Sequence, residues 1–108
     1  MIEWDRVKEL RSEIGNDGFA EVIAMFLEEA DEVIGRIGDT VGTEALEADL
    51  HFLKGAALNL GFAQFAALCR DGERRASGGD AGFDLEQICS SYQASKMTLT
   101  NWQRDSAA

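Results

Sequence analysis

Residues 19–37 read FAEVIAMFLEEADEVIGRI, and this stretch decides the fold of the chain. Its apolar side chains recur at steps of three and four residues over about five turns, the spacing of a helix with one buried face. Most other positions in the stretch are acidic, which suits a face exposed to water. The whole chain is 45% apolar and contains no proline, and strand-like alternation is hard to find. The sequence therefore predicts an all-α protein.

Four further segments show the same helical spacing, so we expect helices at about residues 5–14, 19–37, 43–60, 62–76 and 83–103. Turn residues separate them at positions 15–18 and 77–82, and Gly61 is expected to cap the third helix in the left-handed conformation. Short connections place successive helices antiparallel. The expected fold is an antiparallel up-down four-helix bundle with an additional short N-terminal helix, and residues 1–108 form one domain.

The chain is strongly acidic, with a formal net charge of −10. This charge argues against nucleic acid and against an anionic membrane surface as partners, because both attract basic proteins. Residues 17–49 contain ten acidic residues and one base, Arg36, which we interpret as a solvated surface. The sequence predicts neither a signal peptide nor a membrane-spanning stretch of about 18 apolar residues. Cys69 and Cys89 fit reduced core residues, so we expect a cytoplasmic protein.

The only histidine, His51, is the candidate functional residue. At about 100° per residue, Leu53 lies nearly opposite His51 on the helix, so the imidazole is expected to face solvent. Neutral imidazole is a competent nucleophile at cellular pH. Lys54 provides a cation that can meet phosphoryl oxygens. Gly55 costs about 1 kcal/mol in a helix interior, and the open space that it leaves one turn after His51 suits the approach of a phosphoryl group.

Each residue also has an ordinary interpretation. A lone histidine or lysine on a helix is usually a solvated surface residue, and Gly61 caps a helix whatever the function. Gly55 discriminates between the functional and the ordinary interpretation, because a purely structural helix has little reason for glycine there.

Glu47, four residues before His51, is the expected acceptor for the Nδ1 proton, which would leave Nε2 free to attack.

The sequence His51-Phe52-Leu53-Lys54-Gly55, with Gly61 further on, resembles the histidine-containing phosphotransfer (HPt) domain family. That family carries His-x-x-Lys-Gly followed by a second glycine and an alanine-rich helix. Residues 19–30 also look like the family's second helix, and the resemblance covers about residues 3–103. Members of this family commonly have a small residue at the position of Leu58. Leu58 instead places an apolar side chain beside the site, so the resemblance assigns it to a docking surface.

The resemblance implies a phosphorelay intermediate without turnover of its own, so we do not expect an enzyme. A receiver domain of a response regulator would exchange a phosphoryl group between its aspartate and His51 Nε2, and a histidine kinase is the other expected partner. The receiver would supply Mg²⁺, and the chain itself, a monomer, would hold no cofactor and no metal. The implied roles are stabilisation of the phosphoryl group by Lys54 and Gln64, access at Gly55, helix capping at Gly61, and docking through Glu47, Ala48 and Leu58.

Two alternatives stay open at this point. The chain could be the phospho-accepting domain of a chemotaxis-type or hybrid sensor kinase, although the Met1 start and the Ser106-Ala107-Ala108 end favour a free-standing protein. It could also be a helical adaptor that binds a partner without phosphate transfer. A metal site is poorly supported, because one histidine and no matched cysteine pair give too few preferred ligands.

Overall fold

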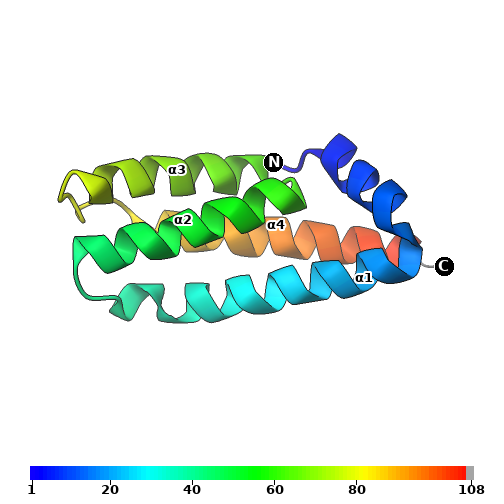
Figure 1. Cartoon of the computed structure of the whole chain (residues 1–108), viewed down its shortest axis with the longest axis horizontal. Coiled ribbons are helices and arrows are strands. Elements are labelled where there is room, and N and C mark those ends of the chain that lie inside the picture. The colour runs from blue at the N-terminus through cyan, green and yellow to red at the C-terminus, as the bar shows by residue number, and fades with distance from the viewer. Residues whose placement is uncertain (107–108) are drawn as a thin grey trace.

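The computed structural model describes residues 1–106, and its regular elements are all helical. No strand occurs in this range, where the only β-type pairing is an isolated bridge between Ile2 and Phe62. Apart from the first turns of the first helix, the helices lie along the long axis of a molecule that measures 46 × 20 × 20 Å (Figure 1). The expected all-α class is therefore confirmed. The elements are α1 (Trp4–Arg36), the short 3-10 helix η1 (Ile37–Asp39), α2 (Thr43–Leu60), α3 (Ala63–Ser77) and α4 (Leu85–Ser106).

The first helix is bent sharply at Gly15, where the backbone has φ 76° and ψ 166°. The sequence predicted a turn over residues 15–18 and a separate short helix before it. Instead, Gly15 alone leaves the helical conformation, and the helix resumes directly, so that both parts belong to α1. A positive φ is readily adopted only by glycine. Residues 4–14, here called the N-terminal limb, cross one end of the helical bundle (Figure 1).

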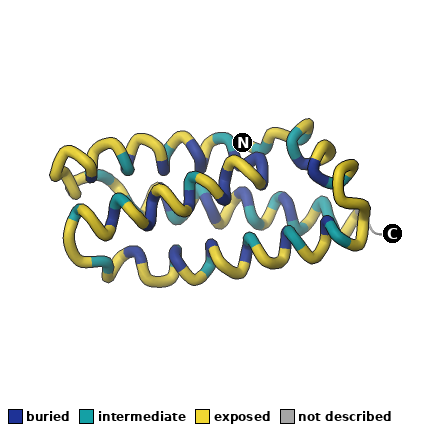
Figure 2. The backbone as a smooth tube through the Cα atoms, in the orientation of Figure 1, coloured by how far each residue is buried: buried dark blue, intermediate teal, exposed yellow. Residues whose placement is uncertain are grey.

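The core runs the length of the bundle between the helices, and the buried positions face inward on every helix (Figure 2). Tyr92 fills its centre, packing against Phe62 and Phe65 with ring centroids 6.3 and 5.2 Å away. Its buried hydroxyl donates a hydrogen bond to Asp31 Oδ1 at 2.6 Å, which satisfies a group that would otherwise be costly to bury. The largest completely buried aliphatic side chains are those of Ile23, Ile37, Leu50, Leu53, Leu60 and Leu99.

Helices α2 and α3 form a closely packed hairpin, and α2 also lies against α1. Gly72 of α3 permits the close approach, because a Cβ atom there would lie 3.0 Å from Leu50 Cδ1 and 3.1 Å from Phe83 Cε2. Helix α2 begins after Gly42, which occupies its N-cap position. No helix of the described chain is long and apolar enough to cross a bilayer.

The tip of the hairpin is tied to the start of the chain. Gly61 ends α2 in the left-handed conformation, with φ 74° and ψ 21°, and its N–H donates to Ala57 O. Its carbonyl accepts a hydrogen bond from Glu3 N at 2.6 Å, and Ala63 N donates to Met1 O at 3.0 Å. These bonds hold residues 1–3, which lead into the N-terminal limb, against the end of α2.

Replacing Gly61 with alanine is expected to lower the free energy of unfolding by about 2 kcal/mol. The left-handed backbone is strained for alanine, and the new Cβ would lie 2.8 Å from the backbone oxygen of Glu3. Urea denaturation of the variant measures the loss. Gly35→Ala is the matched control, because its Cβ meets nothing within 4 Å and its φ is not positive. Equal stability of the Gly61→Ala and wild-type proteins would contradict the prediction.

Candidate functional site

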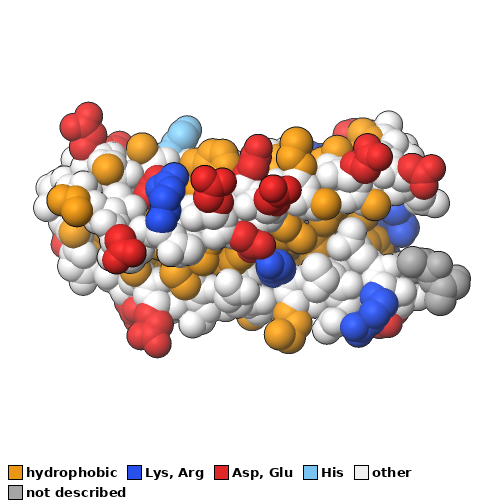
Figure 3. Space-filling view, turned by 90° about the horizontal axis from the view of Figure 1, so that it is seen from below, with side chains coloured by type: hydrophobic (Ala, Val, Ile, Leu, Met, Phe, Trp, Pro, Cys, Tyr) orange, Lys and Arg blue, Asp and Glu red, His pale blue; other side chains and the backbone are white. Residues whose placement is uncertain are grey.

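Helix α2 presents His51 to solvent. The side chain of His51 is 71% exposed, whereas Leu53, nearly opposite on α2, and Leu50, on the flank of the helix, are fully buried. The imidazole, pale blue in Figure 3, projects from the surface of the molecule. Asp49, just before it, accepts hydrogen bonds from Arg36 and Thr40 at 2.8 Å each, which ties this part of α2 to the end of α1 and the following loop. The bundle therefore holds the backbone of His51 in place while its ring stays open to a partner.

The carboxylate beside the imidazole comes from α3. Glu73 Oε1 lies 3.0 Å from His51 Nδ1, so Glu73 takes the place that the sequence assigned to Glu47. The prediction of Glu47 was wrong because it considered only neighbours on the same helix, whereas the hairpin brings α3 closer to the ring. An ionised carboxylate only accepts hydrogen bonds, so Nδ1 must carry the proton. In the neutral ring this leaves the lone pair on Nε2.

Lys54 completes a group of three side chains. Its Nζ lies 2.8 Å from Glu73 Oε2 and 3.2 Å from Oε1. The hydrogen bond from Lys54, and then that from His51, lower the pKa of Glu73, although partial burial opposes them. Glu73 is therefore ionised at neutral pH. Its contribution to stability is present there and is lost as the pH falls through the lowered pKa.

Replacing Glu73 with alanine is expected to remove the preference for the tautomer protonated on Nδ1. The ¹⁵N chemical shifts of the His51 ring measure the tautomer directly, because Nδ1 and Nε2 give distinct signals in each protonation state. Glu47→Ala is the matched control, since Glu47 is the acidic residue one turn before His51 on α2 itself. The assignment of Glu73 would be wrong if Glu47→Ala altered the ring signals and Glu73→Ala did not.

A hollow of about 290 Å³ opens beside the imidazole, between α1 and α2. Gly55 lies in its wall, and a Cβ atom at that position would meet nothing within 4 Å, so the space next to His51 is free. Four large apolar side chains stand exposed on the same two helices: Ile14 at 38%, Met25 at 49%, Phe52 at 41% and Leu58 at 56%. The hollow is lined by Phe26, Glu29, His51, Phe52, Gly55, Ala56 and Asn59.

The structure gathers most of the sequence-predicted site residues near His51, but not all of them. Lys54 and Gly55 are close to the ring along α2, and Ala48 and Leu58 are exposed on that helix. Gln64 lies in the first turn of α3, nine residues before Glu73, which is roughly 13 Å along the helix. It is therefore not brought to His51. The site residues that sequence reasoning missed are Glu73, Phe26, Glu29 and Phe52.

No group of three or more side chains suited to a metal ion occurs among the described residues. The two cysteines of α3 and α4 are both free thiols. Burial raises the pKa of the Cys69 thiol to about 12, so it stays protonated at neutral pH.

A comparison with protein-family models agrees with this geometry. The model of the Hpt domain matches residues 21–100, which is more than half of the chain. The chain is a member of the Hpt family. Hpt domains are phosphotransfer intermediates of phosphorelays, they interact with receiver domains and kinases, and they are generally neither enzymes nor cofactor proteins. No curated protein and no solved structure matches the Hpt chain.

Proposed function

We propose that this Hpt chain, acting as a single domain over residues 1–108, carries a phosphoryl group on His51 Nε2. The phosphoryl group comes from, or passes to, the aspartate of a response-regulator receiver domain. One observation supports this most strongly: an exposed imidazole has its Nδ1 engaged by Glu73 at 3.0 Å, while its Nε2 has no hydrogen-bond partner among residues 1–106. The scaffold in this proposal is an antiparallel up-down four-helix bundle with the N-terminal limb across one end.

The two partners together provide every group that the transfer step requires. The lone pair on Nε2 attacks phosphorus, the N–P bond forms, and the bond between phosphorus and the aspartyl oxygen breaks. The electron pair of that bond leaves with the receiver carboxylate. Positive charge then develops on the ring, and the carboxylate of Glu73 stabilises it through the Nδ1–H hydrogen bond. The receiver contributes Mg²⁺ and most of the stabilisation of the phosphoryl oxygens.

Lys54 is positioned by Glu73 to assist this step. Its ammonium group is held beside the ring by the 2.8 Å ion pair with Glu73. We propose that Lys54 Nζ turns from Glu73 to a phosphoryl oxygen as the group arrives, because charge-assisted hydrogen bonds to phosphate are strong. Gln64 has no part in this proposal, since it lies near the tip of the hairpin.

The docking surface of the proposal surrounds the hollow beside His51. Exposed apolar side chains on α1 and α2 offer an area that a receiver can cover, and Gly55 lets the partner's backbone or phosphoryl group come close. Acidic side chains lie along the face in Figure 3, with hydrophobic side chains between them, so a partner with a basic rim fits best. The surface comprises Met25, Phe26, Glu29, Glu47, Ala48, Phe52 and Leu58.

The test is a transfer assay with isolated receiver domains charged by acetyl phosphate in the presence of Mg²⁺. The proposal predicts loss of phosphate from the receiver and the appearance of acid-labile, base-stable phosphate on the Hpt chain. A chain that binds the charged receiver without acquiring phosphate would instead act as an adaptor. We expect the exchange to take place in the cytoplasm, where free cysteines such as Cys69 and Cys89 also persist.

A further inference from the structure

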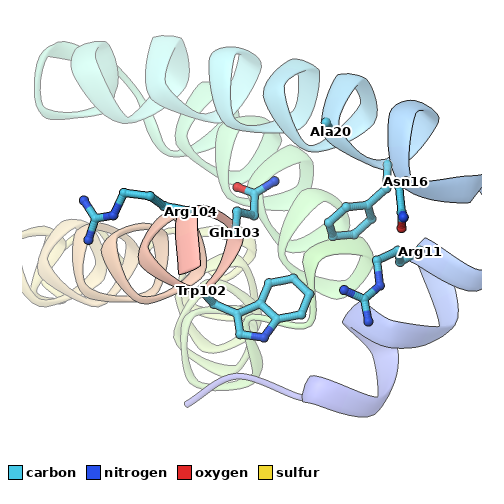
Figure 4. A pocket seen from close by; sticks show the side chains of 7 residues that line it. Arg11, Asn16, Ala20, Trp102, Gln103 and Arg104 are labelled. Carbon is cyan, nitrogen blue, oxygen red and sulfur yellow. The ribbon is translucent and has the colours of Figure 1, made fainter. Parts of the chain in front are cut away.

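A second hollow lies at the end of the bundle crossed by the N-terminal limb. It has a volume of about 590 Å³ and opens between that limb, the start of the long part of α1 and the last turns of α4 (Figure 4). It shares no lining residue with the hollow beside His51, so the proposed function leaves it unused. Its walls consist of Arg11, Asn16, Phe19, Ala20, Trp102, Gln103 and Arg104.

The inner wall of this hollow is aromatic. Trp102 meets Phe19 edge to face, with ring centroids 6.2 Å apart, and Trp4 lies 5.3 Å away on another side. Phe19 is only 4% exposed, so its position is fixed by the core. Rigid aromatic walls of this kind favour a flat apolar group, which can stack or pack edge-on against them. A volume of several hundred Å³ is typical of pockets for small molecules.

The polar side chains at the rim are cationic or neutral. The guanidinium of Arg11 lies over the Trp102 ring, 5.0 Å from its centroid, which leaves its N–H edge available to a ligand. Within residues 1–105, no carboxylate lies at ion-pair distance from Arg11, whereas Arg36 and Arg75 are both paired. No acidic side chain lines the hollow, although the chain carries a net charge of −10. Figure 4 shows Arg11, Asn16, Trp102 and Gln103 around one open space.

We propose that this hollow is a binding site for a small organic anion with a flat aromatic body, of the aromatic carboxylate class. The carboxylate would accept hydrogen bonds from the guanidinium of Arg11, which matches it in planar geometry. The aromatic body would pack against Trp102 and Phe19. Asn16 and Gln103 provide neutral donors at the rim. The guanidinium of Arg104 points away from the open space (Figure 4) and lies 3.9 Å from Asp105 Oδ1, so Arg11 is the cation that faces a ligand.

The two tryptophans of the chain are Trp4 and Trp102, and both lie at this end, so their indole N–H signals report on the site. The probe is 2-naphthoate, titrated into the uniformly ¹⁵N-labelled full chain. We expect a saturable shift of the Trp102 indole signal, and affinity lowered about 10-fold or more in Arg11→Gln, since a charged hydrogen bond is lost. Arg70→Gln is the matched control, because Arg70 is exposed on α3 and its replacement removes the same charge elsewhere. It should bind as the wild type does.

Two further binding measurements test the role of charge in the site. The neutral analogue 2-naphthylmethanol should bind more weakly than 2-naphthoate, and Gln103→Glu, which adds a carboxylate to the wall while keeping Arg11, should also weaken 2-naphthoate. The proposal is overturned if the indole signals do not shift, or if Arg11→Gln and Gln103→Glu both bind as tightly as the wild type. It is equally overturned if 2-naphthylmethanol binds as tightly as 2-naphthoate, or if 2-naphthoate shifts the signals of His51 and Phe52 instead of the indole signals. The second result would place the probe on the docking surface. None of these outcomes depends on phosphoryl transfer.

Discussion

Replacing His51 with glutamine is expected to abolish acceptance of the phosphoryl group. The chain contains no other imidazole, and an amide side chain has no comparable nucleophilic lone pair. The His51 side chain is 71% exposed, so its replacement leaves the core intact, and the free energy of unfolding should stay within about 0.5 kcal/mol of the wild type. The transfer assay with a charged receiver domain measures the first effect, and thermal unfolding measures the second.

A matched variant separates loss of the nucleophile from loss of surface polarity. Asn59→Ala changes a polar, exposed residue of the same helix that lines the same hollow, and it should retain acceptance. If His51→Gln still acquired acid-labile phosphate at the wild-type level, the phosphoryl group would have to reside elsewhere and the proposed function would be wrong.

Replacing Gly55 with leucine is expected to have opposite effects on transfer and stability. Transfer should slow about 100-fold, because a misfit of about 1 Å at a reacting centre can cost that much. The leucine side chain would fill the space that the structure leaves empty beside His51. Stability should instead rise by up to about 1 kcal/mol, since leucine is a far better helix former than glycine. Initial transfer rates from a charged receiver and urea denaturation test the two effects separately.

The smaller change Gly55→Ala distinguishes steric access from the loss of helix flexibility. Its Cβ meets no atom within 4 Å, so stability should rise by about as much as with leucine, whereas the transfer rate should fall far less. If the Gly55→Leu variant accepted the phosphoryl group as fast as the wild type, the partner would not require open space at this position.

The periodic stretches of the sequence were sufficient to place the helices. Residues 19–37 could be assigned to a helix because their apolar spacing fits only that element. Gly61 could be assigned to the end of a helix because glycine favours the left-handed conformation, which the structure has there. The bend at Gly15 was harder to place. Four consecutive turn residues, 15–18, suggest a loop, but only Gly15 has a positive φ, and Asn16 and Asp17 begin the second part of α1.

Glu73 could not be identified from neighbours on the same helix, because its contact with His51 crosses the hairpin. One signal was nevertheless present in the sequence. His51 and Glu73 lie eleven residues before and eleven residues after Phe62, so an antiparallel hairpin that turns there places them opposite each other. Identifying Glu73 therefore required the register of the hairpin. The ion pair between Glu73 and Lys54 depends in addition on side-chain rotamers, which the sequence does not encode.

The hollow beside His51 shows a second limit of sequence reasoning. Phe26 belongs to the apolar stripe of residues 19–37 and was expected in the core. In the structure it is only partly buried and lines the hollow together with Glu29. Periodicity identifies which face of a helix is apolar, but the width of the groove between α1 and α2 decides which of those side chains a partner can touch.

The nitrogen that carries the phosphoryl group tests the central claim most directly. The Hpt chain, labelled with ¹⁵N in its histidine, can be phosphorylated by a charged receiver domain and its ring signals compared with those of the free chain. The hydrogen bond between Nδ1 and Glu73 at 3.0 Å predicts phosphohistidine bonded through Nε2, with Nδ1 still protonated. Phosphohistidine bonded through Nδ1, or a chain whose receiver loses phosphate while His51 stays unmodified, would contradict the account.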